Sequence, residues 1–304
     1  MAKIILINNP RPTAQEQEAM LQLLWQFRKR GNDATLQTGG FFATLVTLFA
    51  TRADVYDFHD LRSSFLIPLS HLIHRDASII LSLYGLEKAR GLSFYIGIKF
   101  ADQIVTSEKT LQYEIYQKYG RLPAYVPLGA TLSKKFFKQG KKDLSRLGLI
   151  ADQKRTNNIT RRFKSKRVKF CTISEQEIES ADSFTTIQSV AAFFLLKTDL
   201  DTNILRKFAL LGLPIVTFNT ETYRDIFRNN ALYIPYASPL AIDNATKELK
   251  NKYSKYRAKA KSLQKFTTNL FSWETVSGEY LGVYQKSNLK SVSIDSLSKT
   301  QVAQ

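Results

Sequence analysis

Residues 101–130 read ADQIVTSEKTLQYEIYQKYGRLPAYVPLGA, and this stretch decides the fold. A short apolar run at residues 104–106 predicts a buried strand, and residues 109–118 carry the pattern of a helix. Another short apolar run, at residues 124–127, follows that helix. A strand, a helix and a second strand in this order predict part of a parallel sheet whose two faces are covered by helices.

The same alternation extends toward the N-terminus. We expect strands at residues 3–8, 34–36, 54–58 and 77–83, and helices at residues 14–30, 41–51, 61–74 and just ahead of residue 101. In the first of these helices, apolar side chains recur at helical spacing from Met20 to Phe27, and Thr13 and Glu16 have the spacing of a capping box. Residues 1–130 therefore predict one α/β domain.

The chain changes character after residue 130. Fourteen Lys and Arg residues lie between residues 131 and 169, opposed by Asp143 and Asp152 alone. The alternation then resumes, with strands expected at residues 168–173, 190–196 and 214–218 and helices at residues 175–189, 203–211, 244–267 and 273–284. Residues 286–304 are rich in Ser, Lys and Gln, which is typical of a mobile tail. We therefore predict a second α/β domain over residues 131–285 and a flexible tail over residues 286–304.

The overall composition restricts the partners. The chain holds 44 Lys and Arg against 26 Asp and Glu, a formal net charge of +18. Such a surplus favours anionic partners, namely nucleic acid, acidic lipid headgroups or phosphorylated sugars. The single cysteine, Cys171, excludes an internal disulfide framework and a cysteine-rich metal site. The sequence shows no signal-peptide core and no apolar run long enough to cross a membrane, so we expect a cytoplasmic protein.

Five stretches together resemble one family, both in their amino-acid sequences and in their order along the chain. They are DVYDFHDLRSSFLIPL (54–69), SLYGLEKARG (82–91), residues 101–130, LLGLPIVTFNTETYRDIFRNNALYIP (210–235) and FSWETVSGEYLGVY (271–284). They resemble the family 4 retaining glycosyltransferases of the GT-B fold, and most of all the bacterial rhamnosyltransferase-like members. The resemblance implies two Rossmann-like domains, an acceptor domain at residues 1–130 and a donor domain at residues 131–285. It also implies that the helix starting at FSWE crosses back to the first domain.

The C-terminal domain departs from the family pattern. DLSRLGLIADQ (143–153) is similar to the usual lead into that domain, but the cations that normally neutralise the donor diphosphate do not follow it. We expect a truncated domain in which no full strand–helix–strand unit fits after this lead. Arg155, Arg161 and Arg162 are candidates to replace the lost cations, and a solvated basic loop is the alternative.

Candidate residues in the first domain gather near predicted strand ends. His59 follows a strand and occupies a place where the family often has a histidine near the acceptor; an alternative is a local ion-pair cluster with Asp57, Asp60 and Arg62. Tyr84 stands where the family has a histidine near the reacting sugar, and packing at the edge of the site is its alternative. The resemblance thus implies catalytic roles for His59 and Tyr84, and acceptor-binding roles for Arg62, Gly85 and Glu87.

Candidate residues in the second domain include a charge reversal. Of the family's paired glutamates, the second falls on Lys207 in this chain, and Asp199, or alternatively Asp201, replaces the first. An ammonium has no acceptor atom, so Lys207 is unable to hold ribose hydroxyls as a carboxylate does, but it is able to contact a phosphate. The resemblance implies a catalytic role for Asp199 and donor-binding roles for Lys207, Thr220 and Glu221.

Three functions compete at this point. The first is a glycosyltransferase that moves a sugar from a nucleotide-diphosphate sugar to a glycan or lipid-linked acceptor, with retention and without metal or cofactor, in polysaccharide biosynthesis. The second is a catalytically inactive relative that binds glycan or acts as scaffold for a partner glycosyltransferase. The third, nucleic-acid binding, lacks any recognition signature beyond charge. The basic residues also favour an anionic membrane surface, with the protein peripheral on its inner face.

Overall fold

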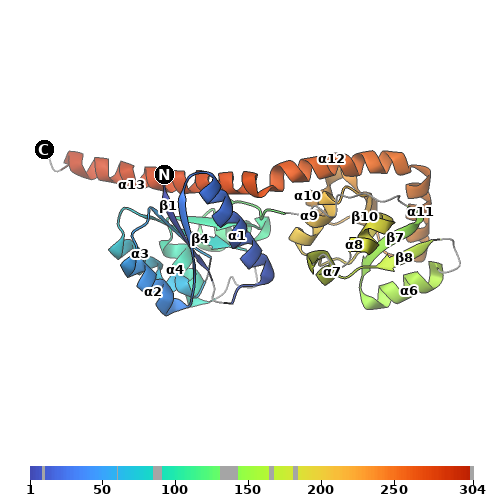
Figure 1. The fold of residues 1–304 in the computed structure, drawn as a ribbon, viewed down its shortest axis with the longest axis horizontal. Helices are drawn as coiled ribbons and strands as arrows, with labels where there is room; N and C mark the ends of the chain where they lie inside the picture. The colour runs from blue at the N-terminus through green and yellow to red at the C-terminus, as the bar shows by residue number, and fades with distance from the viewer. Residues whose placement is uncertain are drawn as a thin grey trace. The chain divides into compact units, whose positions relative to one another are not determined.

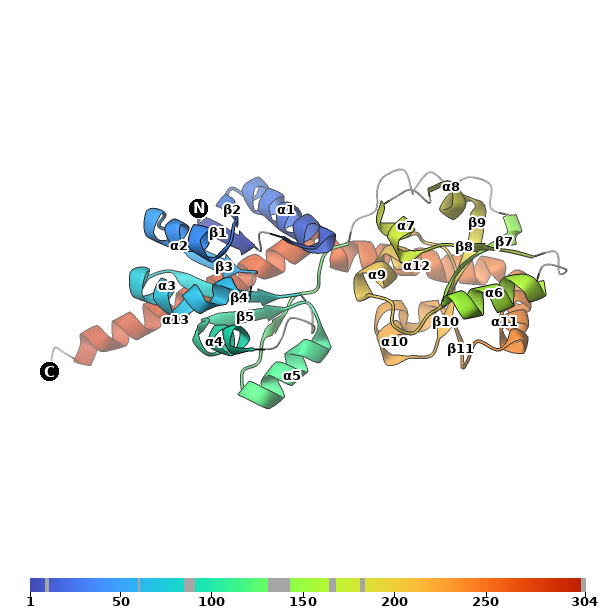
Figure 2. The ribbon, with the colours of Figure 1, turned by 90° about the horizontal axis from the view of Figure 1, so that it is seen from below.

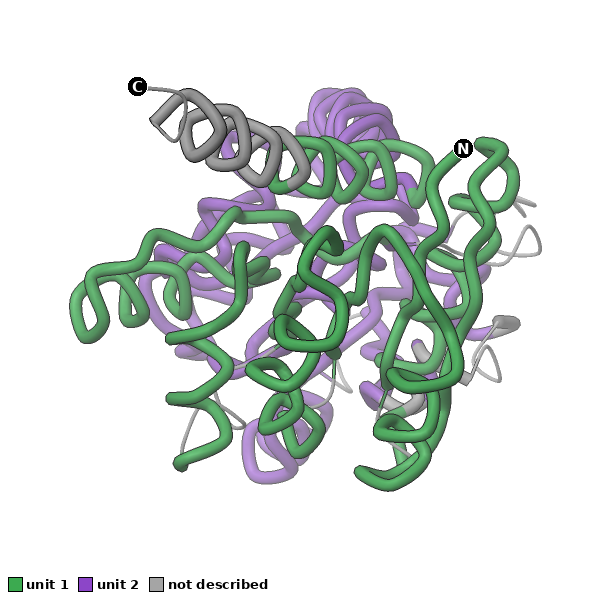
Figure 3. The backbone as a smooth tube through the Cα atoms, turned by 90° about the vertical axis from the view of Figure 1, so that its left-hand side faces the viewer, with its two compact units in different colours: residues 1–129, 273–304 green, residues 130–272 purple. Residues whose placement is uncertain are grey.

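The computed structural model describes residues 1–8, 11–59, 61–84, 91–130, 143–163, 168–180 and 184–301. This part of the chain holds two parallel β-sheets, each in its own compact unit. One unit consists of residues 1–129 and 273–304, and the other of residues 130–272 (Figure 3). The last helix of the chain therefore belongs to the same unit as the N-terminal sheet.

The first sheet has the strand order β2-β1-β3-β4-β5-β6, and every neighbouring pair is parallel. Its strands are β1 (Lys3–Asn8), β2 (Asp33–Thr38), β3 (Val55–Phe58), β4 (Ser78–Leu83), β5 (Gln103–Thr106) and β6 (Ala124–Tyr125). All residues of β3 and β4 are buried. This explains why both strands read as nearly continuous apolar runs, since helices cover both faces of such a sheet.

Two sets of helices cover this sheet (Figures 1 and 2). One face carries α2 (Phe41–Ala50), η1 (Ser63–Leu66), α3 (Ile67–Ile73), α4 (Leu92–Phe100) and α5 (Lys109–Tyr119), and the other carries α1 (Ala14–Lys29) and α13 (Trp273–Gln301). The predicted capping box is confirmed at the start of α1: Thr13 Oγ1 accepts from the Glu16 amide, and the Glu16 carboxylate accepts from the Thr13 amide.

Helix α13 joins the first unit through its first three turns. Trp273, Val276, Tyr280 and Tyr284 recur at helical spacing, and all four are buried in the cluster that includes α1 and β1. The expected return of this helix to the first domain is confirmed. Its helical span reaches Gln301, beyond the predicted end at residue 284.

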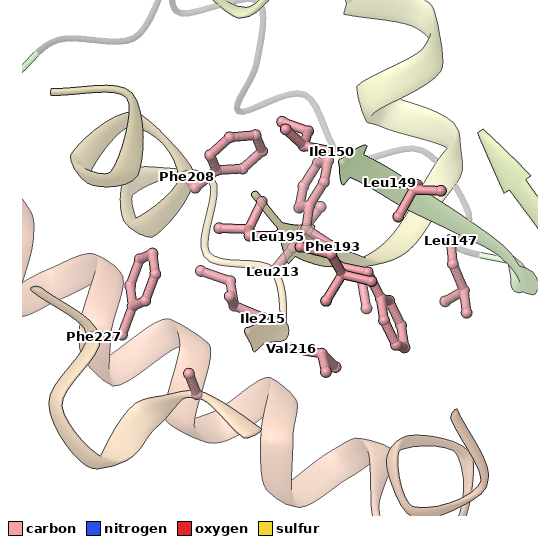
Figure 4. Packing of buried hydrophobic residues seen from close by; sticks show 14 of the residues in the cluster. Leu147, Leu149, Ile150, Phe193, Leu195, Phe208, Leu213, Ile215, Val216 and Phe227 are labelled. Carbon is pink, nitrogen blue, oxygen red and sulfur yellow. The ribbon is translucent and has the colours of Figure 1, made fainter. Parts of the chain in front are cut away.

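The second sheet has the strand order β11-β10-β9-β7-β8 and is also parallel. Its strands are β7 (Asp143–Ala151), β8 (Lys169–Thr172), β9 (Val190–Leu196), β10 (Ile215–Phe218) and β11 (Leu232–Ile234). The helices are α6 (Gln153–Phe163), α7 (Glu175–Ser180), α8 (Phe184–Ser189), α9 (Thr202–Leu210), α10 (Glu221–Phe227), η4 (Arg228–Asn230), α11 (Pro239–Asn251) and α12 (Tyr253–Phe271). Figure 4 shows its core, where Leu147 and Leu149 of β7 and Phe193 of β9 pack with Phe208 of α9 and Phe227 of α10.

The alternative of a solvated basic loop after the lead at residues 143–153 is wrong, because residues 153–163 form the helix α6, which connects β7, the lead itself, to the parallel strand β8. The reason is the spacing of apolar residues inside the basic run. Thr156, Ile159 and Phe163 lie on one buried face of α6, while Arg161 and Arg162 lie on its exposed face. Residues 153–163 are therefore an amphipathic helix and not a solvated loop.

The prediction of a single helix at residues 244–267 is also wrong. The structure has two helices there, α11 and α12, because the backbone at Lys252 leaves the helical region with φ −120° and ψ 29°. The fold class itself is confirmed: the chain forms two Rossmann-like α/β domains. Among the described residues, no helix has both the length and the apolar character needed to cross a bilayer.

Candidate functional site

Strand order identifies where each sheet offers a ligand site. In both sheets the second strand in sequence lies at one side of the first, and the third lies at the other side. The chain therefore leaves the carboxyl ends of β1 and β3, and of β7 and β9, in opposite directions. Such switch points, beyond the carboxyl ends of the strands, are where open α/β sheets bind ligands.

At the switch point of the first sheet, Asp57 is the centre of a buried polar cluster. Its Oδ1 accepts from Ser82 Oγ at 2.7 Å, and its Oδ2 accepts from the Tyr284 hydroxyl at 2.5 Å. His59 Nε2 lies 3.0 Å from the same Oδ2, at ion-pair distance but without the alignment of a hydrogen bond. Three segments thus meet on one carboxylate: β3, β4 and α13.

Tyr84 completes this cluster on the other side of His59. Its hydroxyl lies 2.6 Å from His59 Nδ1, and the two rings stack with centroids 5.2 Å apart and planes 14° apart. With the ring proton of His59 on Nε2, toward Asp57, Nδ1 is the acceptor for the Tyr84 hydroxyl. The order Asp57, His59, Tyr84 is therefore a continuous polar chain that starts in the core.

Burial keeps the phenols of this cluster protonated. It raises the pKa of Tyr84 well above its usual value, with Tyr280 and Asp57 adding to the shift. It also raises the pKa of Tyr280 and of Tyr284, and the charge of Asp57 adds to both shifts. Near neutral pH these side chains are neutral hydrogen-bonding groups.

His59 and Tyr84 differ in how far they are buried within this cluster. The His59 side chain is completely buried, whereas Tyr84 is half-buried and its hydroxyl contacts Tyr280 as well as His59. Because Tyr84 and Asp57 flank the two ring nitrogens of His59, this histidine is placed to orient Tyr84 rather than to bind a ligand itself. Arg62 lies exposed at the start of η1, and Gly85 and Glu87 lie outside the described residues.

At the switch point of the second sheet, Arg155 spans the carboxyl ends of three strands. Its Nη1 donates to the carbonyl of Leu196, the last residue of β9, at 2.9 Å and lies 3.3 Å from Oδ2 of Asp152, next to the end of β7. Its guanidinium also lies 5.7 Å from the ring centroid of Phe218, the last residue of β10. Its side chain remains 42% exposed, so the guanidinium is fixed in place and still open to a ligand.

An ion-pair group lies at the same carboxyl ends. Lys197, directly after β9, has its Nζ 2.5 Å from Glu175 Oε1 and 3.8 Å from Asp199 Oδ1. The hydrogen bond with Glu175 raises the pKa of Lys197. The Tyr223 hydroxyl donates to the Lys197 carbonyl, and burial raises the pKa of Tyr223, with Asp199 and Glu175 adding to the shift. Asp199 thus belongs to this group through Lys197, and its side chain is 73% exposed.

Thr220 and Glu221 follow β10 and begin α10. The Thr220 hydroxyl accepts from the Tyr223 amide and caps the helix, and Glu221 is exposed in the first turn. Both residues lie at the carboxyl edge of the sheet, the edge that Arg155 spans.

Other predicted residues do not gather there. Arg161 and Arg162 lie in the last turn of α6, at the opposite end of that helix from Arg155. Lys207 is buried on α9 with 7% exposure, and among the described residues its ammonium makes no hydrogen bond or ion pair. The donor-binding roles of all three stay predictions.

Sequence reasoning missed several partners in both sites. Ser82, Tyr280 and Tyr284 were not candidates, and Asp57 was considered only for a local ion pair. A carboxylate inside the apolar run VYDF and two tyrosines four residues apart in the last helix were the available signals. In the second site, Lys197 and Glu175 follow two different strands, and only the strand order brings them together.

Comparison with known proteins shows what this fold is similar to. No protein-family model matches the chain, and no curated protein sequence matches it. HepE (Alr3699) of Anabaena, solved with UDP, superimposes with a TM-score of 0.63 at 12% identity over 94% of this chain and 100% of HepE, and it has also been solved with UDP-glucose.

Two further solved structures are similar over nearly their whole length. AviGT4, a glycosyltransferase involved in avilamycin A biosynthesis, has a TM-score of 0.56 at 13% identity, over 95% of this chain and 99% of AviGT4. A glycosyltransferase from Rickettsia africae ESF-5 has a TM-score of 0.60 at 8% identity, over 94% of this chain and 98% of that one. At these identities the likeness shows the fold, a pair of Rossmann-like domains of GT-B type.

Among the described residues, no three His, Cys, Asp or Glu side chains are grouped as a metal ion would require.

Proposed function

We propose that this chain is a glycosyltransferase that transfers a sugar from a nucleotide-diphosphate sugar to a glycan or lipid-linked acceptor. The observation that carries the proposal is Arg155, a fixed and partly open guanidinium at the switch point of the second sheet. The fold is shared with HepE, which has been solved with UDP and with UDP-glucose. A diphosphate needs cations or N–H donors as the leaving group develops charge.

The second unit supplies suitable groups for a donor. Arg155 lies in the first turn of α6, so its guanidinium and the free amides of that helix end would both face a diphosphate. The exposed carboxylates of Asp199 and Glu221 and the hydroxyl of Thr220 would accept or donate hydrogen bonds to sugar or ribose hydroxyls. Arg161, Arg162 and Lys207 would then act at longer range, through charge.

The first unit supplies the acceptor side in this proposal. The Tyr84 hydroxyl, which is in contact with His59 and Tyr280, would form a further hydrogen bond with an incoming sugar hydroxyl. Arg62, Gly85 and Glu87 would bind the acceptor in this proposal. Transfer would proceed with retention of the anomeric configuration. It would need no metal, because Arg155 would neutralise the charge of the diphosphate, as a bound metal does elsewhere.

The domain roles and the cellular place are part of the same proposal. The unit of residues 1–129 and the helix from Trp273 would form the acceptor domain, and the unit of residues 130–272 would form the donor domain. The enzyme would act in the cytoplasm in polysaccharide biosynthesis, peripheral on the inner face of the membrane, with the basic residues of 131–169 attracted to anionic lipid.

A second candidate is a catalytically inactive relative that binds glycan or serves as scaffold for a partner glycosyltransferase. Lys207 favours it, since an ammonium on this largely buried residue replaces a carboxylate that accepts hydroxyl protons in the family. The two candidates differ in turnover and not in fold.

Calorimetric titration with UDP tests the donor site. Binding by the full chain should weaken about tenfold or more in Arg155→Ala, because a charge-assisted phosphate contact is lost. Lys247→Ala is the matched control, since it removes the same charge from an exposed ion pair on α11. No measurable binding by the unchanged chain, or equal binding by both variants, would remove the basis of the proposal.

Turnover separates the two candidates. UDP-glucose should be slowly hydrolysed or transferred in the presence of a chelator, and the anomeric form of the product, followed by NMR, should match that of the donor. Binding of UDP without any turnover across a panel of UDP-sugars and acceptors would favour the inactive relative. Turnover that stops in chelator would contradict the metal-free mechanism.

A further inference from the structure

The helix α2 has an uncovered apolar side. Its sequence, FFATLVTLFA, contains no charged residue, and Thr44 and Leu48 face the sheet. On the outward side, Phe42, Val46 and Phe49 are 79%, 64% and 66% exposed. A helix that is apolar all round is ordinarily covered on all sides. The described part of this chain covers one side only.

The helices η1, α3 and α4 pack beside α2 or beside one another, and they also carry exposed apolar residues. His74 at the end of α3 contacts the Leu48 carbonyl of α2 through Nε2 at 2.6 Å, and His71 of α3 contacts the Phe100 carbonyl of α4 in the same way at 2.9 Å. Figures 1 and 2 show α2, α3 and α4 on the same side of the sheet. We call the exposed apolar residues of this surface the apolar face: Phe42, Val46, Phe49, Phe65, Leu72, Leu92, Tyr95 and Phe100.

The helices that carry the apolar face contain one positive charge and no negative charge. Residues 41–50, 63–73 and 92–100 contain no Asp or Glu, and Lys99 is their only Lys or Arg. The Lys99 ammonium lies 6.0 Å and 5.4 Å from the ring centroids of Tyr95 and Phe100, so its stem runs along exposed aromatic surface. Aromatic side chains beside a long cation are typical of the headgroup level of a membrane.

We propose that the apolar face docks on an anionic lipid membrane. Phenylalanine side chains of α2 enter the boundary between headgroups and acyl chains, and Lys99 reaches the lipid phosphates. The net charge of +18 attracts the whole chain to the same surface. The chain lies on the bilayer, and the contact is made by the first unit whatever reaction the second unit supports.

Flotation with vesicles of phosphatidylethanolamine and phosphatidylglycerol tests this contact on the full chain. Phe42→Ser combined with Phe49→Ser should lower the vesicle partition coefficient about tenfold or more, since burying one phenylalanine contributes at that level. The matched control is Leu21→Ser combined with Trp25→Ser, which removes two exposed apolar side chains from α1 on the other face of the sheet. The control should float like the unchanged chain.

A second measurement does not depend on removing apolar side chains. Phe42→Trp in a Trp25→Phe background should show fluorescence quenching by brominated lipid, whereas the unchanged chain, with Trp25 on α1, should show little. The remaining Trp273 is buried in both proteins.

Several outcomes would overturn the proposal. They are no flotation of the unchanged chain, equal loss in both double variants, or no quenching at position 42. A dimer that dissociates in the α2 variant, without vesicle binding by the unchanged chain, would assign the apolar face to a second copy. Equal binding to neutral phosphatidylcholine vesicles would contradict the anionic part of the proposal.

Discussion

Among single residues, Asp57 has the most demanding environment in the first unit. It is completely buried, and a buried carboxylate is tolerated only when its lone pairs are satisfied. Ser82 and Tyr284 each donate to it, and His59 lies at ion-pair distance. The same contacts orient His59 and, through it, Tyr84, so core stability and site geometry depend on one side chain.

Removing one donor from this carboxylate should be costly. Tyr284→Phe leaves the shape of the core unchanged but deletes a hydrogen bond to a charged group, so we expect a loss of about 1.5–3 kcal/mol in the free energy of unfolding. Tyr236→Phe, at an exposed position, is the control and should leave stability unchanged. Urea unfolding of the two variants measures the difference, and equal midpoints would mean that Asp57 does not need the Tyr284 hydroxyl.

Among the elements, α13 depends on close contact with the end of the first domain. A Cβ added at Gly129 would lie 2.3 Å from Trp273 Cδ2, far inside van der Waals contact. The indole is buried in the core that includes β1 and α1, so it has little room to move. The glycine in VPLGA therefore has a packing role.

Gly129→Ala should destabilise the first unit by about 1–3 kcal/mol, because the added methyl group overpacks the site. Gly282→Ala is the control within α13, where nothing lies within 4 Å of the new Cβ, and it should be neutral or stabilising because alanine favours helix. Thermal unfolding of both variants checks this. A neutral Gly129→Ala would show that Trp273 yields at small cost.

At the scale of the whole molecule, the chain has separate hydrophobic cores in its two units. Two clusters, one on each face of the first sheet, contain only residues of the first unit, and a third contains only residues of 130–272. The first unit is discontinuous, since residues 1–129 are joined by the helix from Trp273. Cooperative unfolding is therefore expected unit by unit.

Leu147→Ala should lower the stability of the second unit by about 2–5 kcal/mol, because it opens a cavity in that core. Hydrogen exchange should accelerate over residues 143–163 and 184–272 and stay unchanged over residues 1–59. Ile80→Ala in β4 should give the converse pattern. Faster exchange in both units of either variant would mean that the chain unfolds as one.

By itself, the sequence determined the alternation of strands and helices and the capping box at Thr13 and Glu16, and its resemblance to a known family implied the return of the last helix. These features depend on local periodicity, on caps and on short motifs, all of which can be read along the chain. The same reasoning placed His59 at the end of a strand, whereas Tyr84 and Arg155 were candidates through the family resemblance. It failed inside the basic run, where charge concealed the buried face made by Ile159 and Phe163.

Only the tertiary structure decided which side chains meet. Tyr284 reaches Asp57 from 227 positions away, and Arg155 reaches the Leu196 carbonyl from 41 positions away. Such contacts exist because parallel strands bring their carboxyl ends to one edge of the sheet. The order of the strands in the sheet cannot be read from any short stretch of the sequence. Burial then separates His59, enclosed between two partners, from Tyr84, which stays partly open.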